Sequence, residues 1–227
     1  MNLALYIAKR YIVSKKSNNA INVISWISVS AIAVGTCALV IVLSGMNGLT
    51  GLVENLYNAF DADIEITSSK GKVFIPDSTL IKKIKSIDGV IYINPTIEDN
   101  ALLKYDDKQT LATIKGVSTD FFKMSRFDTL IFEGKYFTKE KNNYFTILGK
   151  GVAYRLGVNL NNAFVPVSMY SPKRGKSSSI NPEDAFIESK VYPSGLFTIN
   201  DEFDFKYAII DVEAARNLFG YFNEVST

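Results

Sequence analysis

Histidine is absent from the 227-residue chain, and cysteine occurs once, at Cys37. Without histidine or a second thiol, zinc centres and catalysis by Cys/His or Ser/His/Asp groups are effectively excluded. A disulfide framework is excluded as well, although a domain of this size can bury a core without one. The sequence therefore predicts no metal site, no cofactor and no catalytic residues.

Charge is absent from one long stretch, since the 37 consecutive residues from Ser17 to Val53 carry none. The four basic residues before it, at positions 9, 10, 15 and 16, are accompanied by no acid. All 23 acids and the other 21 basic residues follow the stretch. The net charge of +2 therefore comes from a cluster beside an apolar run, which argues against nucleic-acid binding.

The uncharged stretch contains a 24-residue apolar run from Ala20 to Leu43. As a helix it would be about 36 Å long, against about 30 Å for the hydrocarbon core of a bilayer. A cleaved signal peptide has a shorter apolar core and a small-residue cleavage site, and a buried helix of a soluble protein needs a polar face. Both alternatives fit less well than a transmembrane helix.

The flanking charges predict the orientation of this helix. The basic cluster lies on its N-terminal side, while residues 44–51 on the other side are uncharged. By the positive-inside rule we expect a cytoplasmic N-terminus and everything after Leu43 across the membrane. Residues 3–16 place apolar side chains at helical spacing, which favours an interfacial amphipathic helix; a plain basic flank is the alternative.

The remainder of the chain predicts a domain of helices and strands. Its first part continues the helix and then reads as strand, capped helix, strand and hairpin, an α+β unit with an antiparallel sheet. The expected elements are a helix over 52–60, strands 62–69, 90–97, 100–105 and 109–117, a helix after Asp77 and a short helix within 118–125.

The second part contains further strands and two glycine-terminated helices. The expected elements are a strand from Tyr144, a helix over 151–156, strands 162–170, 185–192 and 205–210, and a helix from Asp211 to Gly220. The segment 171–184 is basic at its start and polar throughout, which predicts an exposed loop. Acid pairs such as Asp106 and Asp107 fall in predicted turns, where they are common for backbone reasons.

Several motifs resemble those of the lipoprotein-releasing ABC permeases LolC and LolE, within the broader FtsX/MacB-like superfamily. They are an Arg10-Tyr11 pair, a serine-rich stretch from Val23 to Ser28, a Gly35-x-x-Ala38-Leu39-Val40 core and a Ser44-x-Met46-Asn47-Gly48 exit. Further along, Ile114 to Val117, Ile147 to Gly149 and Ala153 to Val158 resemble later blocks of the family in the same order.

The resemblance implies an α+β fold with a single N-terminal transmembrane helix and a MacB-like periplasmic domain. Residues 1–16 would be the cytoplasmic amphipathic segment and 17–60 the transmembrane helix with its periplasmic extension. The periplasmic domain would cover 61–227. It would have an α+β lobe at about 61–130 and 200–222, and a mostly β lobe at about 131–199. Such permeases have three more membrane helices, so we expect these residues to be the N-terminal part of the subunit.

The resemblance also implies a function in the bacterial inner membrane. A permease of this type is non-catalytic and works with a cytoplasmic ABC ATPase, a second permease subunit (identical or different), membrane lipid, a lipoprotein substrate and a periplasmic lipoprotein chaperone. The loop matching the chaperone-recruiting loop of the family predicts a partner site, for which an ordinary solvated loop is the alternative. Its candidate residues are Met169, Tyr170, Pro172, Lys173, Arg174 and Lys176.

A second candidate site lies on the transmembrane helix, where an acyl chain would enter. Its residues, at helical spacing, are Val29, Ile32, Thr36, Val40 and Leu43. Two other functions share the same architecture: regulation of cell-wall hydrolases by an FtsX-like protein, and efflux by a MacB-like component. A periplasmic enzyme is a further alternative.

Overall fold

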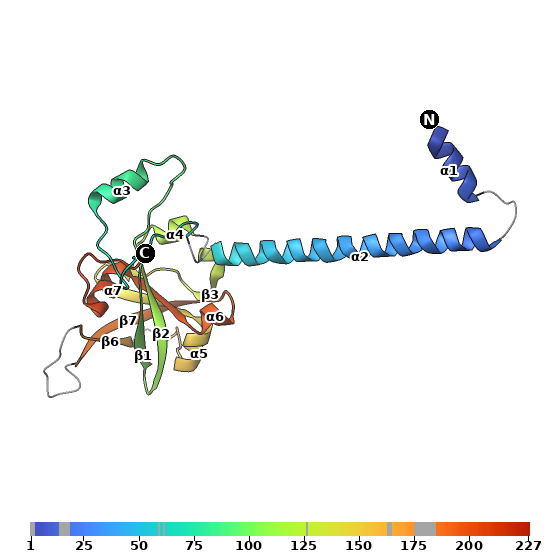
Figure 1. The fold of residues 1–227 in the computed structure, drawn as a ribbon. Helices are drawn as coiled ribbons and strands as arrows, with labels where there is room; N and C mark the ends of the chain where they lie inside the picture. The colour runs from blue at the N-terminus through green and yellow to red at the C-terminus, as the bar shows by residue number, and fades with distance from the viewer. Residues whose placement is uncertain are drawn as a thin grey trace. The chain divides into compact units, whose positions relative to one another are not determined.

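The computed structural model describes residues 3–13, 19–58, 60, 62–125, 127–162, 165–174 and 185–227. The chain divides into two compact units, residues 1–55 and 56–227. The first unit consists of helix α1 (Leu3–Val13) and most of helix α2 (Asn19–Asn58) (Figure 1). At 1.5 Å per residue, the 40 residues of α2 extend about 60 Å. Its segment Val23–Gly51 is apolar and long enough to cross a bilayer, which agrees with the predicted span.

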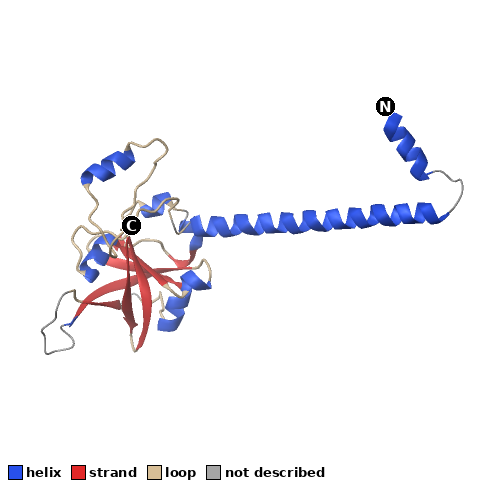
Figure 2. Ribbon diagram, in the orientation of Figure 1, coloured by secondary structure: helices blue, strands red, loops and turns tan. Residues whose placement is uncertain are grey.

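The second unit is built on one eight-stranded mixed sheet, shown in red in Figure 2. Its strands are β1 (Ile97–Tyr105), β2 (Lys108–Val117), β3 (Ile131–Gly134), β4 (Lys139–Glu140), β5 (Asn143–Gly149), β6 (Val167–Pro172), β7 (Phe186–Phe197) and β8 (Tyr207–Asp211). The strand order is β3-β7-β6-β1-β2-β8-β5-β4, and β5 also pairs with β7. This extra pairing closes the six strands from β7 to β5 into a ring.

Short helices accompany the sheet. They are α3 (Ser78–Lys85), α4 (Phe121–Met124), the 3₁₀ turn η1 (Phe127–Leu130), α5 (Lys150–Leu156), α6 (Asp201–Asp204) and α7 (Val212–Phe219). Both α5 and α7 contact β2 and bury apolar side chains there. Each ends at a glycine in the left-handed conformation, Gly157 (φ 69°) and Gly220 (φ 65°), as the sequence predicted.

The α+β prediction is confirmed, and so are the β1–β2 hairpin with its turn at Asp106 and the capped helices α3 and α7. The expectation of an antiparallel sheet is only partly right. The hairpin is antiparallel, but β2 pairs parallel with β8 and β5 pairs parallel with β7. The proposed boundaries of the two lobes remain a prediction.

The predicted strands at 62–69 and 90–97 are wrong, because all of 62–69 and residues 90–96 lack strand pairing. Their alternating apolar residues do not suffice, since a strand also needs a free edge to pair with. The backbone just before and at the start of β1 is already hydrogen-bonded to the C-terminal residues. The Thr96 amide donates to the Thr227 carbonyl at 2.9 Å, and the Glu98 amide donates to the Ser226 hydroxyl at 2.9 Å.

Candidate functional site

Helix α2 presents an apolar surface that no part of the described chain covers. None of the apolar window within Val23–Gly51 is buried. The five predicted acyl-chain residues follow one another at steps of 3, 4, 4 and 3, so they share one face of this helix. The apolar four are between 53% and 68% exposed, and Thr36 is exposed with them; in sequence order the five are Val29, Ile32, Thr36, Val40 and Leu43.

Hydroxyl groups within this apolar helix bond to the helix itself. Ser28 donates to the Ile24 carbonyl at 2.9 Å, and Thr36 donates to the Ile32 carbonyl at 2.9 Å. An unsatisfied polar group costs several kcal/mol in hydrocarbon, so these bonds make the two side chains compatible with lipid. The surface is therefore suited to contact with acyl chains or with other membrane helices.

Phe60 lies two residues beyond the end of α2 and is buried in the core of the second unit, with 1% of its surface exposed. Its ring contacts Phe203 edge-on at a centroid distance of 4.8 Å, Tyr207 at 4.9 Å and Phe197 at 5.9 Å. Aromatic pairs in these geometries contribute about 0.5–1.5 kcal/mol each beyond area burial. The polypeptide leaving α2 is thus anchored by an aromatic cluster, which we call the Phe60 anchor (Phe60, Phe197, Phe203 and Tyr207).

A buried lysine completes this anchor. The Lys115 ammonium lies 4.4 Å from the centre of the Phe60 ring and forms a 2.9 Å ion pair with Glu98. The Lys115 side chain is 4% exposed, whereas that of Glu98 is 29% exposed. A desolvated cation over an aromatic face is worth about 2 kcal/mol. The lysine therefore links the Phe60 anchor to the hairpin formed by β1 and β2.

The predicted partner loop is described only at its base. Met169 was expected to be presented to a partner, but its side chain points inward from β6 and is fully buried in the core. Tyr170 points to the other side, and its hydroxyl donates to Glu188 on β7 at 3.1 Å. Pro172 and Lys173 are exposed. Lys176 lies outside the described residues.

Arg174 is exposed at the end of the described part of the loop, and its guanidinium lies 3.7 Å from the centre of the Tyr221 ring. Burial raises the pKa of the Tyr221 hydroxyl, and the positive charge of Arg174 partly offsets that effect. The structure therefore brings Arg174 to the C-terminal end of α7, a contact that the sequence did not predict.

Charged groups also connect β4 with the start of α7. Lys139 donates to Glu213 at 2.5 Å, and this hydrogen bond lowers the pKa of Glu213. Asp211 caps α7 by accepting from the Glu213 amide at 2.9 Å. Its burial raises the pKa of its carboxyl group, although the backbone bond works against that shift. These contacts stabilise the fold and do not converge on a catalytic centre.

The described residues contain no group of three or more His, Cys, Asp or Glu side chains able to hold a metal ion. Sequence reasoning missed the Phe60 anchor, because a lone phenylalanine after a helix carries no motif. The only signal in the sequence was the presence of aromatic residues at positions 60, 197, 203 and 207. Their convergence depends on the pairing of β8 with β2 and could not be read from spacing.

Comparison with known proteins identifies the family of the domain. The family of the MacB-like periplasmic core domain matches residues 25–167. The transmembrane protein LolE of the lipoprotein-releasing system of Haemophilus influenzae is 23% identical over 97% of this chain and 52% of its own length. LolC of Neisseria meningitidis serogroup B is 26% identical over 71% of this chain and 39% of its own length.

The chain therefore spans about half the length, or less, of these curated relatives. Among solved structures, the extracellular domain of the noncanonic ABC-type transporter YknZ from Gram-positive bacteria matches with a TM-score of 0.43 and 16% identity. That match covers 70% of this chain and 72% of the other.

Proposed function

The chain belongs to the family of MacB-like periplasmic core domains, and from this premise we propose that it is the N-terminal part of an ABC transporter permease subunit. The observation that carries the proposal is the continuity of the uncovered apolar helix α2 with the Phe60 anchor. A membrane helix that is followed, two residues later, by a side chain buried in the core of a folded domain can transmit movement to that domain. ATP would be hydrolysed by a separate cytoplasmic ATPase subunit, and this chain would contribute no catalytic group.

We propose lipoproteins as the substrate, released from the inner membrane toward a periplasmic chaperone. The support is the similarity to LolE and LolC, together with the motifs of residues 10–48. The exposed residues of α2 from Val29 to Leu43 would border the place where an acyl chain leaves the bilayer. A second permease subunit would pack on another face of the same helix, where a side-chain atom added at Gly35 would meet nothing within 4 Å.

The proposed orientation places the N-terminus in the cytoplasm and residues 56–227 in the periplasm. It can be tested with maleimide labelling in intact cells, because Cys37 is the single cysteine. In a Cys37→Ala background, a cysteine at Tyr154, which is 82% exposed, should react with a membrane-impermeant maleimide. A cysteine at Lys9 should react only after the cells are broken. The reverse pattern would overturn the orientation.

The proposed partner site is tested by photocrosslinking from positions 170 and 174 in the full-length permease. Capture of the purified lipoprotein chaperone at these positions, and not from Phe132 on β3, would support lipoprotein release. Capture of a cell-wall hydrolase instead would favour an FtsX-like regulator. Capture of an outer-membrane tunnel component would favour MacB-like efflux. Either of the last two results would overturn the lipoprotein proposal.

A further inference from the structure

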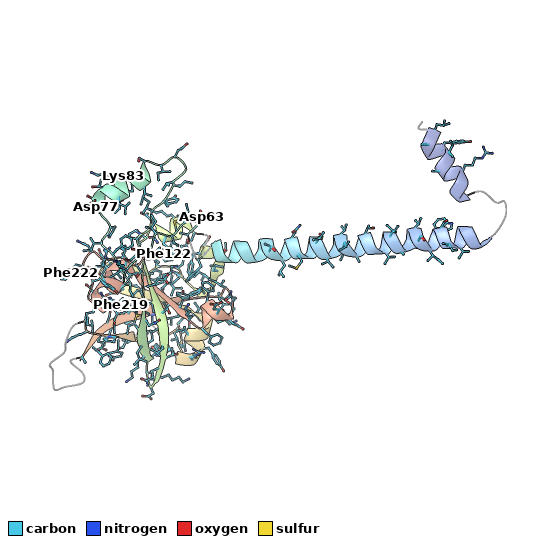
Figure 3. All side chains as sticks on the ribbon, in the orientation of Figure 1. Asp63, Asp77, Lys83, Phe122, Phe219 and Phe222 are labelled. Atoms are coloured by element: carbon cyan, nitrogen blue, oxygen red, sulfur yellow. The ribbon has the colours of Figure 1, made fainter. Side chains whose placement is uncertain are left out.

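The turn after α7 holds an aromatic side chain in solvent. Gly220 ends the helix, and the Tyr221 amide donates a hydrogen bond to the Arg216 carbonyl at 2.9 Å. Tyr221 and Val225 are both buried, while Phe222 between them is 87% exposed. In Figure 3, Phe222 lies at the outer edge of the domain, on the same side as Phe219. Full exposure of a phenylalanine is costly in water, which makes such a residue a candidate contact for a partner.

The turn that carries Phe222 is fixed rather than loose. The Phe222 amide donates to the Glu224 carboxylate at 2.7 Å, and the Asn223 amide donates to the same oxygen at 3.1 Å. Val225 exchanges two backbone hydrogen bonds with Phe74, at 2.8 and 2.9 Å. An aromatic group held in this way loses little conformational entropy when a partner binds.

An open pocket lies beside Phe222, lined by Tyr144, Glu213, Arg216, Asn217, Gly220, Tyr221 and Phe222. Of the lining residues, Arg216 has a buried Nε atom with no hydrogen-bond partner in the described part of the chain. A buried donor without a partner is costly, and a carboxylate in the pocket would pair with the charge of this guanidinium group.

A second guanidinium contacts a residue that lines this pocket. Arg174 is exposed and stacks on Tyr221, which also lines the pocket. Neither Arg174 nor Arg216 forms an ion pair with a carboxylate among the described residues, whereas Lys72 and Lys139 are paired with Asp99 and Glu213. The charge of Arg216 acts only at longer range on Glu213, and that of Arg174 on Glu224, where each helps to lower the pKa of the carboxyl group. The two guanidinium groups, near an exposed aromatic ring, therefore complement a segment that is both acidic and apolar.

We propose that Arg174, Arg216, Asn217 and Phe222 form a binding site for an acidic peptide segment of a partner protein. A carboxylate of the segment pairs with the guanidinium groups, and a neighbouring apolar side chain packs on Phe222. The inference rests on the proposed function for the identity of the partner, since Arg174 belongs to the loop proposed to recruit a chaperone. The chemistry of recognition does not depend on transport.

The test measures fluorescence anisotropy of labelled peptides with the full chain in detergent micelles. The probes are GDDLFG, its uncharged counterpart GNNLFG, and GDDSSG, which lacks the apolar residues. We expect saturable binding of GDDLFG that weakens with added salt, and at least about tenfold weaker binding of the other two peptides. Equal binding of GDDLFG and GNNLFG, or no saturable binding of GDDLFG, would overturn the proposal.

Variants locate the site. Arg174→Gln and Phe222→Ser change exposed side chains, so the fold should survive, and each should weaken GDDLFG binding by at least about tenfold. Arg155→Gln and Phe132→Ser change an exposed arginine and an exposed phenylalanine elsewhere, and should leave binding within about twofold. Unchanged binding in Phe222→Ser would refute the site. If the wild type bound no GDDLFG while the permease still released lipoproteins, this inference would be refuted and the proposed function would stand.

Discussion

Replacing Phe60 by alanine tests whether the end of α2 is anchored in the core of the second unit. Truncation of a buried phenylalanine costs about 3–5 kcal/mol through lost burial and the cavity that remains. The upper part of this range applies here, because three aromatic rings lie within 5.9 Å of Phe60 and the Lys115 ammonium lies 4.4 Å from its centre. Rings held by strands β7 and β8 cannot easily collapse into the cavity.

This cost is large beside the 5–15 kcal/mol that is ordinary for a domain. A loss of 3–5 kcal/mol lowers the Tm of a unit of this size by roughly 6–20 °C, at about 2–4 °C per kcal/mol. Phe60→Leu should lose roughly half as much, because leucine keeps part of the apolar volume but not the ring contacts. The assay is thermal unfolding of the full chain in micelles, followed by near-ultraviolet circular dichroism, to which α2 adds little beyond Trp26.

Phe132→Ala serves as the matched control, since Phe132 is 56% exposed and its truncation should change the free energy of unfolding by no more than about 0.5 kcal/mol. If Phe60→Ala also stayed within about 1 kcal/mol of the wild type, the aromatic cluster would not hold the end of α2. Phe60 would then provide no basis for transmitting movement of α2 to the domain.

Three further changes act on other parts of the chain. A hydrogen bond from Lys139 lowers the pKa of Glu213 below its ordinary 4.5. The stabilisation from this bond is therefore present above pH 4.5 and is lost as the pH falls through the lowered pKa. The Tm difference between the wild type and Glu213→Gln should be largest near neutrality and shrink in acid. Gly116→Ala places a Cβ 2.4 Å from that of Ala215, so urea unfolding should show a loss of about 1–3 kcal/mol. Leu39→Arg in the middle of α2 should raise the free energy of membrane insertion by about 3 kcal/mol, measured as the inserted fraction in a translocon assay.

Each of these expectations can be contradicted. A Tm difference for Glu213→Gln that grew in acid would mean that folding does not lower the pKa of Glu213. A Gly116→Ala variant as stable as the wild type would mean that α7 can move away from β2. Gly45→Ala is the control for that change, since a Cβ there meets nothing within 4 Å. Unchanged insertion of Leu39→Arg would argue against a spanning helix.

The elements that the sequence predicted correctly are those defined by local physics. The uncharged run gives α2, and the glycines at 157 and 220 end α5 and α7. The β1–β2 hairpin follows from its turn at Asp106, where φ is 53°. In each case the determining residues lie within a few positions of one another.

The errors arise where distant segments compete. The alternation at 90–97 predicted a strand, but the C-terminal residues Ser226 and Thr227 hydrogen-bond to Thr96 and Glu98 there. β7 runs to Phe197, five residues beyond its predicted end. It continues because its last residues pair with β5 across an irregularity in register between Thr146 and Ile147. Local patterns contain no information about either pairing.

The candidate sites divide in the same way. The apolar face of α2 from Val29 to Leu43 was predictable, because helical periodicity alone places its residues together. The burial of Met169 was not expected, since Met169 was assigned to the partner loop whereas β6 continues to Pro172. The contact between Arg174 and Tyr221 joins residues 47 positions apart. Only the fold brings these two side chains together.

The most direct test of the central claim is lipoprotein release by the full-length permease, reconstituted in proteoliposomes with its ATPase and second permease subunit. We expect that adding ATP moves a radiolabelled triacylated lipoprotein into the soluble fraction, bound to the periplasmic chaperone. We also expect Phe60→Ala to reduce this release more than it reduces ATP hydrolysis, and Phe132→Ala to affect neither. If the lipoprotein stayed in the membrane while the complex hydrolysed ATP, this chain would not belong to a lipoprotein-releasing permease.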